Sequence, residues 1–276
     1  MSGLAVITGL AAEARIANAP EAVTIVGAGR GDRLAADIET AIARGAQRLL
    51  SCGIAGALAP GLRPGDLVVA QGVIDGGRRL ACDPDWVAAM LERLAPPSLR
   101  AERSNPKIVT DAELPRRSDS GQTAKATISG LLRSARNDGW RPIRELASVA
   151  PDIAGVETPL ASVAAKAVLY AATGAAAVDM ESAAVARAAA RHGLPFAILR
   201  AIADPAQRPL PLAALVAMRA DGGVALGAVL GALAQNPGQL PDLVRLGLDS
   251  RRGFSSLVRA RALLGADFAS VDLGDL

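Results

Sequence analysis

Short apolar runs rich in β-branched residues alternate along this chain with alanine-rich segments, and this alternation constrains the fold more than any other feature. The predicted strands are Leu4–Thr8, Val23–Val26, Arg48–Ser51, Leu67–Val73, Ala175–Val178 and Phe196–Ala203. The predicted helices are Arg33–Arg44, Asp85–Leu94, Ala161–Ala172 and Ser182–Arg191. Short strands that alternate with helices are typical of a mostly parallel sheet with helices on both faces. The pattern therefore predicts an α/β protein with three layers, helix, sheet and helix.

The length and composition limit the classes of partner. A chain of 276 residues forms one large α/β domain or two small ones. Hydrophobic residues make up 51% and charged residues 21%, a balance that excludes a disordered chain. Aromatic residues make up only 2%, too few for the stacking platforms that bind single-stranded nucleic acid. A net charge of +3 does not by itself indicate a polyanionic partner. We therefore expect no nucleic-acid partner.

The sequence also argues against a metal site and against secretion. Cys52 and Cys82 lack metal-ligand spacing and are predicted to be reduced thiols. The single histidine, His192, precedes Gly193 at an apparent helix end, where a cationic residue suits the helix dipole, so we interpret it as structural. The apolar segment Leu4–Ala12 has no preceding Lys or Arg and is predicted to be a buried strand rather than a signal peptide. We expect a cytoplasmic protein without metal or cofactor, which could still touch a membrane surface.

Two regions depart from the alternating pattern. From about Glu102 to Ala150 the chain is polar and Arg-rich, which predicts a solvated, partly disordered insertion within a domain of residues 1–235. Beyond the break at Asn236–Gly238, leucines recur at helical spacing with arginines between them. Residues 236–276 are therefore predicted to form a helical C-terminal extension. A helix packed on the domain is the first interpretation, and a basic surface on anionic lipid is the alternative.

A glycine-rich turn at Gly27–Gly31 follows a predicted strand and precedes a helix. The dinucleotide-binding fingerprint needs a third glycine at the sixth position, where this chain has Asp32. We interpret the segment as a flexible turn, with dinucleotide binding as a minor alternative.

Small and acidic residues gather at the ends of three predicted strands. Gly9 and Glu13 follow the first strand, Gly53–Gly56 follows the strand that begins at Arg48, and Asp204 closes the strand that begins at Phe196. Ligands of open parallel sheets bind outside the carboxyl ends of the strands, and small residues there let backbone amides approach a substrate. Two carboxylates at such ends can perform acid–base chemistry in one pocket.

Three motifs in order resemble the superfamily of purine nucleoside phosphorylases and methylthioadenosine/adenosylhomocysteine nucleosidases. They are Gly53–Leu58 (GIAGAL) with Pro60–Val69 (PGLRPGDLVV), Ala177–Ser182 (AVDMES) and Phe196–Asp204 (FAILRAIAD). The resemblance implies a nucleoside phosphorylase-like fold with a mixed, mostly parallel sheet, cleavage of a purine N-glycosidic bond, and a homo-oligomer. Gly9–Arg15 (GLAAEAR) and Asn236–Pro241 (NPGQLP) further resemble the hopanoid-associated phosphorylase branch. That branch implies phosphorolysis of adenosylhopane, a lipid-linked nucleoside, with release of adenine.

The resemblance also implies roles for individual residues. Asp204 corresponds to the residue that protonates purine N7, and Glu181 to the residue that holds the ribose hydroxyls, with Met180 packed against the sugar. The other implied substrate-binding residues are Ala55, Gly56 and Val178. In the nucleosidase branch a glutamate after the first strand activates water, and Glu13 is the candidate here. In phosphorylases an early Gly/Arg pair and a serine bind phosphate; Gly9 and Arg15 are candidates for the pair, but Ile54 stands at the serine position.

These implications leave alternatives open. Phosphorolysis, with phosphate as co-substrate, follows from the branch resemblance, and hydrolysis by a methylthioadenosine/adenosylhomocysteine-type nucleosidase is the alternative. A non-catalytic nucleotide-binding module that uses Gly27–Gly31 is a second alternative. If the substrate is a lipid, the C-terminal region and the apolar run Leu210–Met218 are the candidates for an apolar groove. Arg200 lies within a predicted buried strand and is expected to form an ion pair with Asp179 or Glu181.

Overall fold

The computed structural model describes residues 3–20, 22–29, 31–95, 151–215, 222–223 and 225–270, and the polar insertion expected at about 102–150 lies outside them. The strands are β1 (Leu4–Thr8), β2 (Val23–Val26), β3 (Arg48–Ala57), β4 (Leu67–Ala70), β5 (Gly72–Asp75), β6 (Arg78–Ala81), β7 (Asp152–Gly155), β8 (Ala177–Asp179) and β9 (Phe196–Asp204). The helices are α1 (Ala11–Ala17), α2 (Gly31–Ala43), α3 (Pro84–Leu94), α6 (Val163–Thr173), α7 (Ser182–His192), α8 (Leu212–Leu215), α9 (Leu226–Gln235) and α10 (Leu240–Leu264). A short 3₁₀ turn, Pro237–Gln239, joins α9 to α10.

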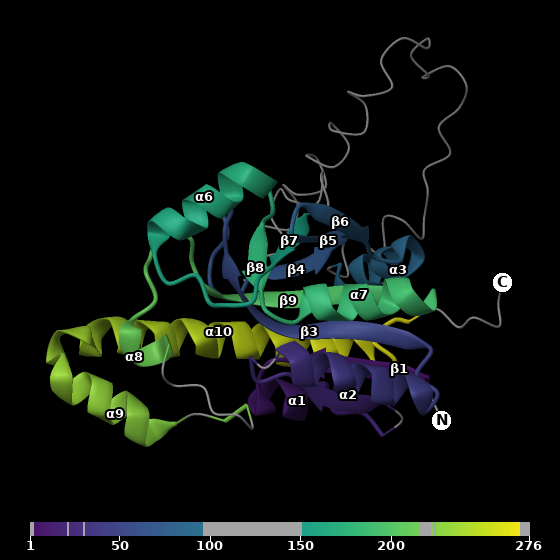
Figure 1. The fold of residues 1–276 in the computed structure, drawn as a ribbon, viewed down its shortest axis with the longest axis horizontal. Helices are drawn as coiled ribbons and strands as arrows, with labels where there is room; N and C mark the ends of the chain where they lie inside the picture. Colours follow the sequence, from purple (N-terminus) through teal and green to yellow (C-terminus); the bar gives the residue numbers. More distant parts are fainter. Residues whose placement is uncertain are drawn as a thin grey trace, which may run out of the picture.

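These nine strands form one mixed sheet (Figure 1). Strand β1 pairs in parallel with β2 and β3, and β3 pairs in parallel with β9. Strands β5, β7 and β8 are also parallel to one another. The antiparallel pairs are β3 with β8, β4 with β9, and the hairpin of β5 and β6. The sheet is therefore mostly parallel, as the alternating sequence pattern predicts.

Strand β3 connects the two halves of this sheet and is longer than the sequence predicted. It extends to Ala57 instead of ending at Ser51, so Gly53–Gly56 lies within the strand and not in a loop after it. The glycine at position 53 explains how the strand continues past crowded side chains. A Cβ atom there would lie 2.5 Å from Nη1 of Arg200 and 2.7 Å from the carboxyl carbon of Glu13. A glycine inside a strand can thus mark a close approach of neighbouring groups rather than the strand's end.

The predicted strand Leu67–Val73 is wrong in its extent, because the structure divides it into β4 and β5. The break falls at Gln71, whose N–H donates to the carbonyl of Pro151 and whose carbonyl accepts from Cys82. The two strands pair with different partners, β4 with β9 and β5 with β6 and β7. A continuous apolar run therefore conceals a change of partner strand.

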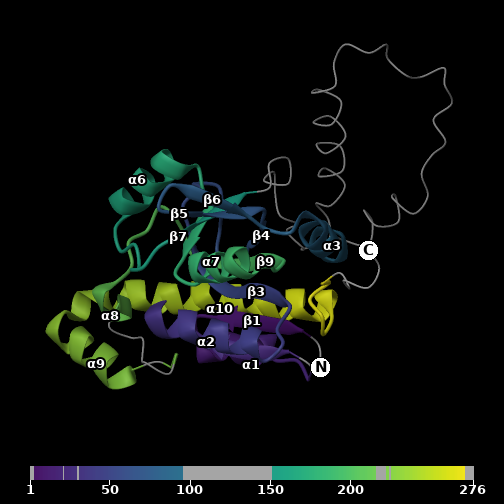
Figure 2. The ribbon, with the colours of Figure 1, turned by 45° about the vertical axis from the view of Figure 1, so that its right-hand side comes forward.

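Helices cover both faces of the sheet (Figures 1 and 2). Helices α2 and α7 contact each other, and a second group, α1, α3 and α10, meets along α10. Strand β9 contacts both α7 and α10 and is buried along its whole length. His192 ends α7 before the left-handed cap at Gly193, and its Nε2 lies 2.7 Å from Glu39, as expected for a structural histidine.

The predicted C-terminal helical segment appears as α10, which lies against β9. Its residues Leu257, Ala260 and Leu264 are buried in the main core. The segment after Asn236 thus takes part in the core of the fold. Among the described residues, no helix is both long enough and apolar enough to cross a membrane.

Candidate active site

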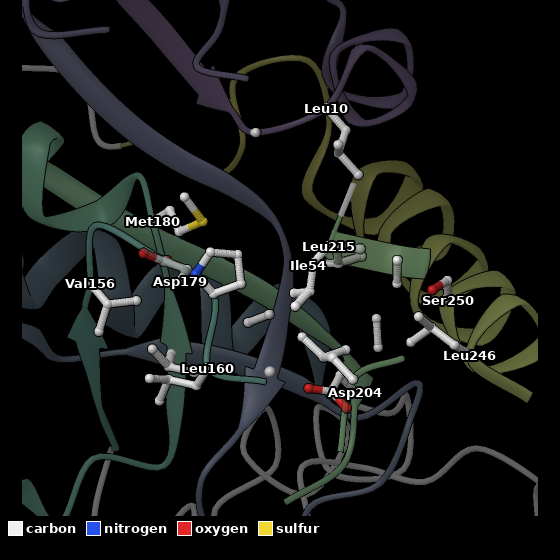
Figure 3. A pocket seen from close by; sticks show the side chains of 18 of the residues that line it. Leu10, Ile54, Val156, Leu160, Asp179, Met180, Asp204, Leu215, Leu246 and Ser250 are labelled. Carbon is white, nitrogen blue, oxygen red and sulfur yellow. The ribbon is translucent and has the colours of Figure 1, made fainter. Parts of the chain in front are cut away.

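A cavity of about 270 Å³ opens where β1, β3 and β9 end and β8 crosses the end of β3 (Figure 3). Its volume is slightly below the roughly 300–1,000 Å³ typical of small-molecule sites. The predicted site residues that line it are Gly9, Glu13, Ala55, Gly56, Val178, Met180, Glu181 and Asp204. Arg15 is exposed on α1 and is not part of this lining. The structure therefore brings together all of the predicted site residues except this arginine.

Glu13 is fixed at the cavity by the backbone around it. It lies in the first turn of α1 and is only 2% exposed. Its Oε2 accepts hydrogen bonds from the N–H groups of Gly9 and Leu10, and its Oε1 accepts one from Ile54, each at 2.8 Å. Burial raises the pKa of this carboxyl above its ordinary value, while the Arg200 cation and the three amide donors oppose the rise.

Glu181 and Asp179 share one buried cation, Arg200. The Arg200 Nε lies 2.6 Å from Oδ2 of Asp179, and its Nη2 lies 3.5 Å from Oε2 of Glu181. The same Nη2 donates to the hydroxyl of Ser51 at 2.6 Å. The expected ion pair is thus confirmed with both acids. Burial raises the pKa of Glu181, and the nearby negative charge of Asp179 raises it further, whereas Arg200 lowers it.

Glu181 also lies close to the loop that follows β1. A Cβ atom at Gly9 would lie 2.7 Å from Oε1 of Glu181, so only glycine leaves room for the carboxylate at this point. The loop after β1 and the start of α7 therefore meet at the cavity although Gly9 and Glu181 are 172 positions apart in the sequence.

Asp204 occupies the carboxyl end of β9, opposite Gly56 in the register with β3. Its Oδ2 lies 2.5 Å from Nζ of Lys166, which is 1% exposed and also lines the cavity. Burial raises the pKa of Asp204 above its ordinary value, and the Lys166 ammonium and Arg208 oppose this rise. Lys166 is not among the site residues predicted from the sequence, although a single lysine in an otherwise uncharged helix was a usable signal.

One side of the cavity is apolar. The apolar residues that line it include Leu10, Ile54, Val156, Pro159, Leu160, Leu210, Ala214, Leu215 and Leu246. Leu210, Ala214 and Leu215 belong to the apolar run expected to form a groove, and Leu246 comes from α10. The C-terminal region therefore contributes directly to the cavity wall.

The glycine-rich turn at Gly27–Gly31 is near the cavity without lining it. The N–H of Gly27 donates to the carbonyl of Thr8, and that of Ala28 to the carbonyl of Gly9. In the part of the chain that the structure describes, no cluster of His, Cys, Asp and Glu has the arrangement of a metal site. The titratable side chains that line the cavity in the described part of the chain are four carboxylates and Lys166.

The protein has a three-layer α/β fold with an acid-lined cavity at the carboxyl ends of its strands. This is the position at which open-sheet α/β proteins bind small molecules. The family model described as the phosphorylase superfamily matches residues 16–234, and the chain belongs to this superfamily.

Solved structures show the same fold. An S-adenosylhomocysteine nucleosidase from Streptococcus pyogenes, in complex with 5-methylthiotubericidin, is 17% identical, with a TM-score of 0.52 over 93% of this chain and 94% of that one. A 5′-methylthioadenosine/S-adenosylhomocysteine nucleosidase from S. pneumoniae, with a transition-state inhibitor, is 14% identical, with a TM-score of 0.52 over 93% and 97%. The comparison with curated proteins finds no match.

Proposed function

We propose that this protein cleaves the N-glycosidic bond between adenine and the ribose of a nucleoside that carries an apolar 5′ substituent. The observation that supports the proposal most strongly is the meeting of Asp204, Glu181 and Glu13 around one cavity. Such cleavage leaves positive charge on the ribose ring and negative charge on the departing base, so it needs an acid near the base and carboxylates near the sugar. The two solved structures described above are of nucleosidases, which accords with this reaction class.

The three acids fit separate steps. Asp204 donates a proton to purine N7, because burial favours the protonated form of its carboxyl. Glu181 accepts hydrogen bonds from the ribose hydroxyls, with Met180 at the sugar. Glu13 takes a proton from the attacking water while the oxygen of that water forms a bond to the anomeric carbon. The bond to the base breaks with its electron pair on the purine, and the products are free adenine and the sugar.

The charge of the lining favours water over phosphate as the acceptor. The described lining carries the acids Glu13, Asp179, Glu181 and Asp204, and its cation, Lys166, is already paired with Asp204. A phosphate dianion needs unpaired donors, and Arg15 does not reach this cavity. Product analysis with and without inorganic phosphate separates the two reactions. Free sugar in both conditions supports hydrolysis, whereas a sugar phosphate that forms only with phosphate establishes phosphorolysis, as the branch resemblance implies.

The apolar wall of the cavity supports the proposal that the 5′ substituent is apolar. Leu210, Leu215 and Leu246 offer an apolar surface at the cavity, which favours burial of hydrocarbon over a charged group. Adenosylhopane, which the sequence resemblance implies, is the extreme case of such a substrate.

The experiment is to incubate the protein with adenosine and with adenosines that carry 5′-alkylthio groups of increasing length, and to measure free adenine. We expect kcat/KM to rise with chain length, by about three- to fourfold for each buried methylene. An equal or falling kcat/KM along the series contradicts the apolar 5′ group, and no adenine from any substrate contradicts the reaction itself.

A further inference from the structure

Lys166 has an environment that its helix does not explain. It is the one buried residue of α6, while the large apolar residues Val163, Val168 and Tyr170 of the same helix are exposed. A helix that packs by the hydrophobic effect buries apolar residues and leaves lysine in water. In α6 Leu169 is only partly buried against the core, whereas Lys166 is fully buried, so burial of the ammonium needs a specific reason.

Every proton of that ammonium has an acceptor in one short segment. Lys166 Nζ lies 2.5 Å from Oδ2 of Asp204, 3.1 Å from the carbonyl of Pro205 and 2.8 Å from the carbonyl of Arg208. An ammonium has three donors, and this arrangement uses all of them. The two carbonyls fix the position of Nζ, so the cation stays against one particular oxygen of Asp204.

We propose that Lys166 is a positioning residue for the acid step: its ammonium holds Oδ2 of Asp204, leaves Oδ1 for the purine, and stabilises the carboxylate that remains after the proton has passed to the base. This inference rests on the proposed function. The step balances, since the O–H bond of Asp204 breaks, an N–H bond forms at purine N7, and Lys166 keeps all of its protons. No described residue is hydrogen-bonded to Oδ1, and Asp204 lines the cavity.

The charges around Asp204 determine the direction in which its neighbours shift its pKa. Burial makes its proton harder to release, and the groups that act on it from neighbouring elements are Lys166 on α6, Arg208 after β9 and Asp249 on α10. Lys166 and Arg208 lower the pKa of Asp204, whereas Asp249 raises it. Since Asp249 is itself paired with Arg208, Lys166 provides the cation in direct contact with the acid. Without it, Asp204 holds its proton to higher pH and donates it less readily.

The test is Lys166→Met, which keeps the chain length and removes the charge, measured as kcat against pH for adenine release. We expect kcat to fall by about 10²-fold with KM changed less than about threefold, and the alkaline limb of the profile to move to higher pH. Ser162→Ala is the matched control, because Ser162 caps α6 through the N–H of Ala165 and does not contact Asp204. It weakens the same helix and is expected to leave the pH profile in place.

A second substrate separates positioning from structural damage. In a 5′-substituted 4-nitrophenyl riboside the leaving group departs without a proton, so Lys166→Met is expected to cleave it within about threefold of the unchanged protein. Equal losses on both substrates, or a kcat and pH profile for adenine release equal to those of the unchanged protein, overturn the positioning role. If Lys166→Met does not fold, Lys166→Gln is measured by the same two assays. Failure of the unchanged protein to release adenine contradicts the proposed function instead, so the two failures are distinguishable.

Discussion

At the scale of residues, the site is a set of acids that the fold buries away from water. Glu13 and Glu181 are buried, and Arg200 is the one cation within reach of both among the described residues. Burial of a carboxylate costs free energy unless hydrogen bonds and opposite charges compensate it. The raised pKa values of these acids show that compensation is incomplete, as is common at sites that need proton transfer.

Glu181→Gln should separate stability from activity. The folded-state pKa of Glu181 is above its ordinary value of 4.5, so its stabilising contribution is complete below about pH 4.5 and is lost as pH rises through the folded-state pKa. Each unit of this difference costs about 1.4 kcal/mol of unfolding free energy at high pH. We expect Glu181→Gln to lose adenine release while its Tm falls less than that of the unchanged protein between about pH 5 and pH 8.

The control for this measurement is Glu39→Gln. The pKa of its exposed carboxyl is lowered by Arg191 and His192, so the stabilising effect of Glu39 is lost as pH falls. This pH dependence of stability has the opposite sign to that of Glu181. A steeper fall of Tm with rising pH in Glu181→Gln than in the unchanged protein contradicts the account.

At the scale of elements, β3 and α10 each contribute both to the core and to the cavity wall. Strand β3 carries Ile54, Ala55 and Gly56 to the cavity, and its irregularity between Ala55 and Gly56 occurs where Asp204 ends β9. Helix α10 contributes Leu246 and Ser250 to the cavity and buries its distal half against β9. Each element thus couples the packing of the core to the geometry of the acids.

Gly53→Ala tests the close approach within β3. The added methyl group meets Arg200 and Glu13 at less than 3 Å, so one of these tethered side chains must move. We expect a loss of about 1–3 kcal/mol in unfolding free energy and a reduced kcat, measured by urea unfolding and adenine release. Gly61→Ala, where nothing lies within 4 Å of the added atom, is the control and should change neither quantity. Equal behaviour of the two variants would show that position 53 has more room than the structure indicates.

Leu257→Ala tests whether α10 belongs to the core. Leu257 is 2% exposed, whereas its neighbour Val258 is 54% exposed. Removal of the buried leucine should cost about 2–5 kcal/mol of unfolding free energy, and Val258→Ala less than about 0.5 kcal/mol. Similar small losses in both variants would show that the helix contributes little to the stability of the sheet.

At the scale of the whole molecule, the sequence predicted the layered fold and most of the cavity, because strand periodicity and the rule for carboxyl ends depend on local pattern. It did not predict the course of β3 through Gly53, since that depends on side chains from β9 and α1. It did not find Lys166, because a lysine's burial is decided by the carbonyls of a segment 39 and 42 residues away. The resemblance to phosphorylases made Arg15 a candidate for phosphate binding, yet that side chain is exposed on α1.

The most direct test of the central claim compares the unchanged protein with Asp204→Asn in the release of adenine from a 5′-alkylthioadenosine. Asparagine keeps the shape of the side chain and its contact with the cavity but has no acidic proton to transfer to the base. The account predicts a fall in kcat of about 10²- to 10⁴-fold with little change in KM. Adenine release by Asp204→Asn at the rate of the unchanged protein would contradict it.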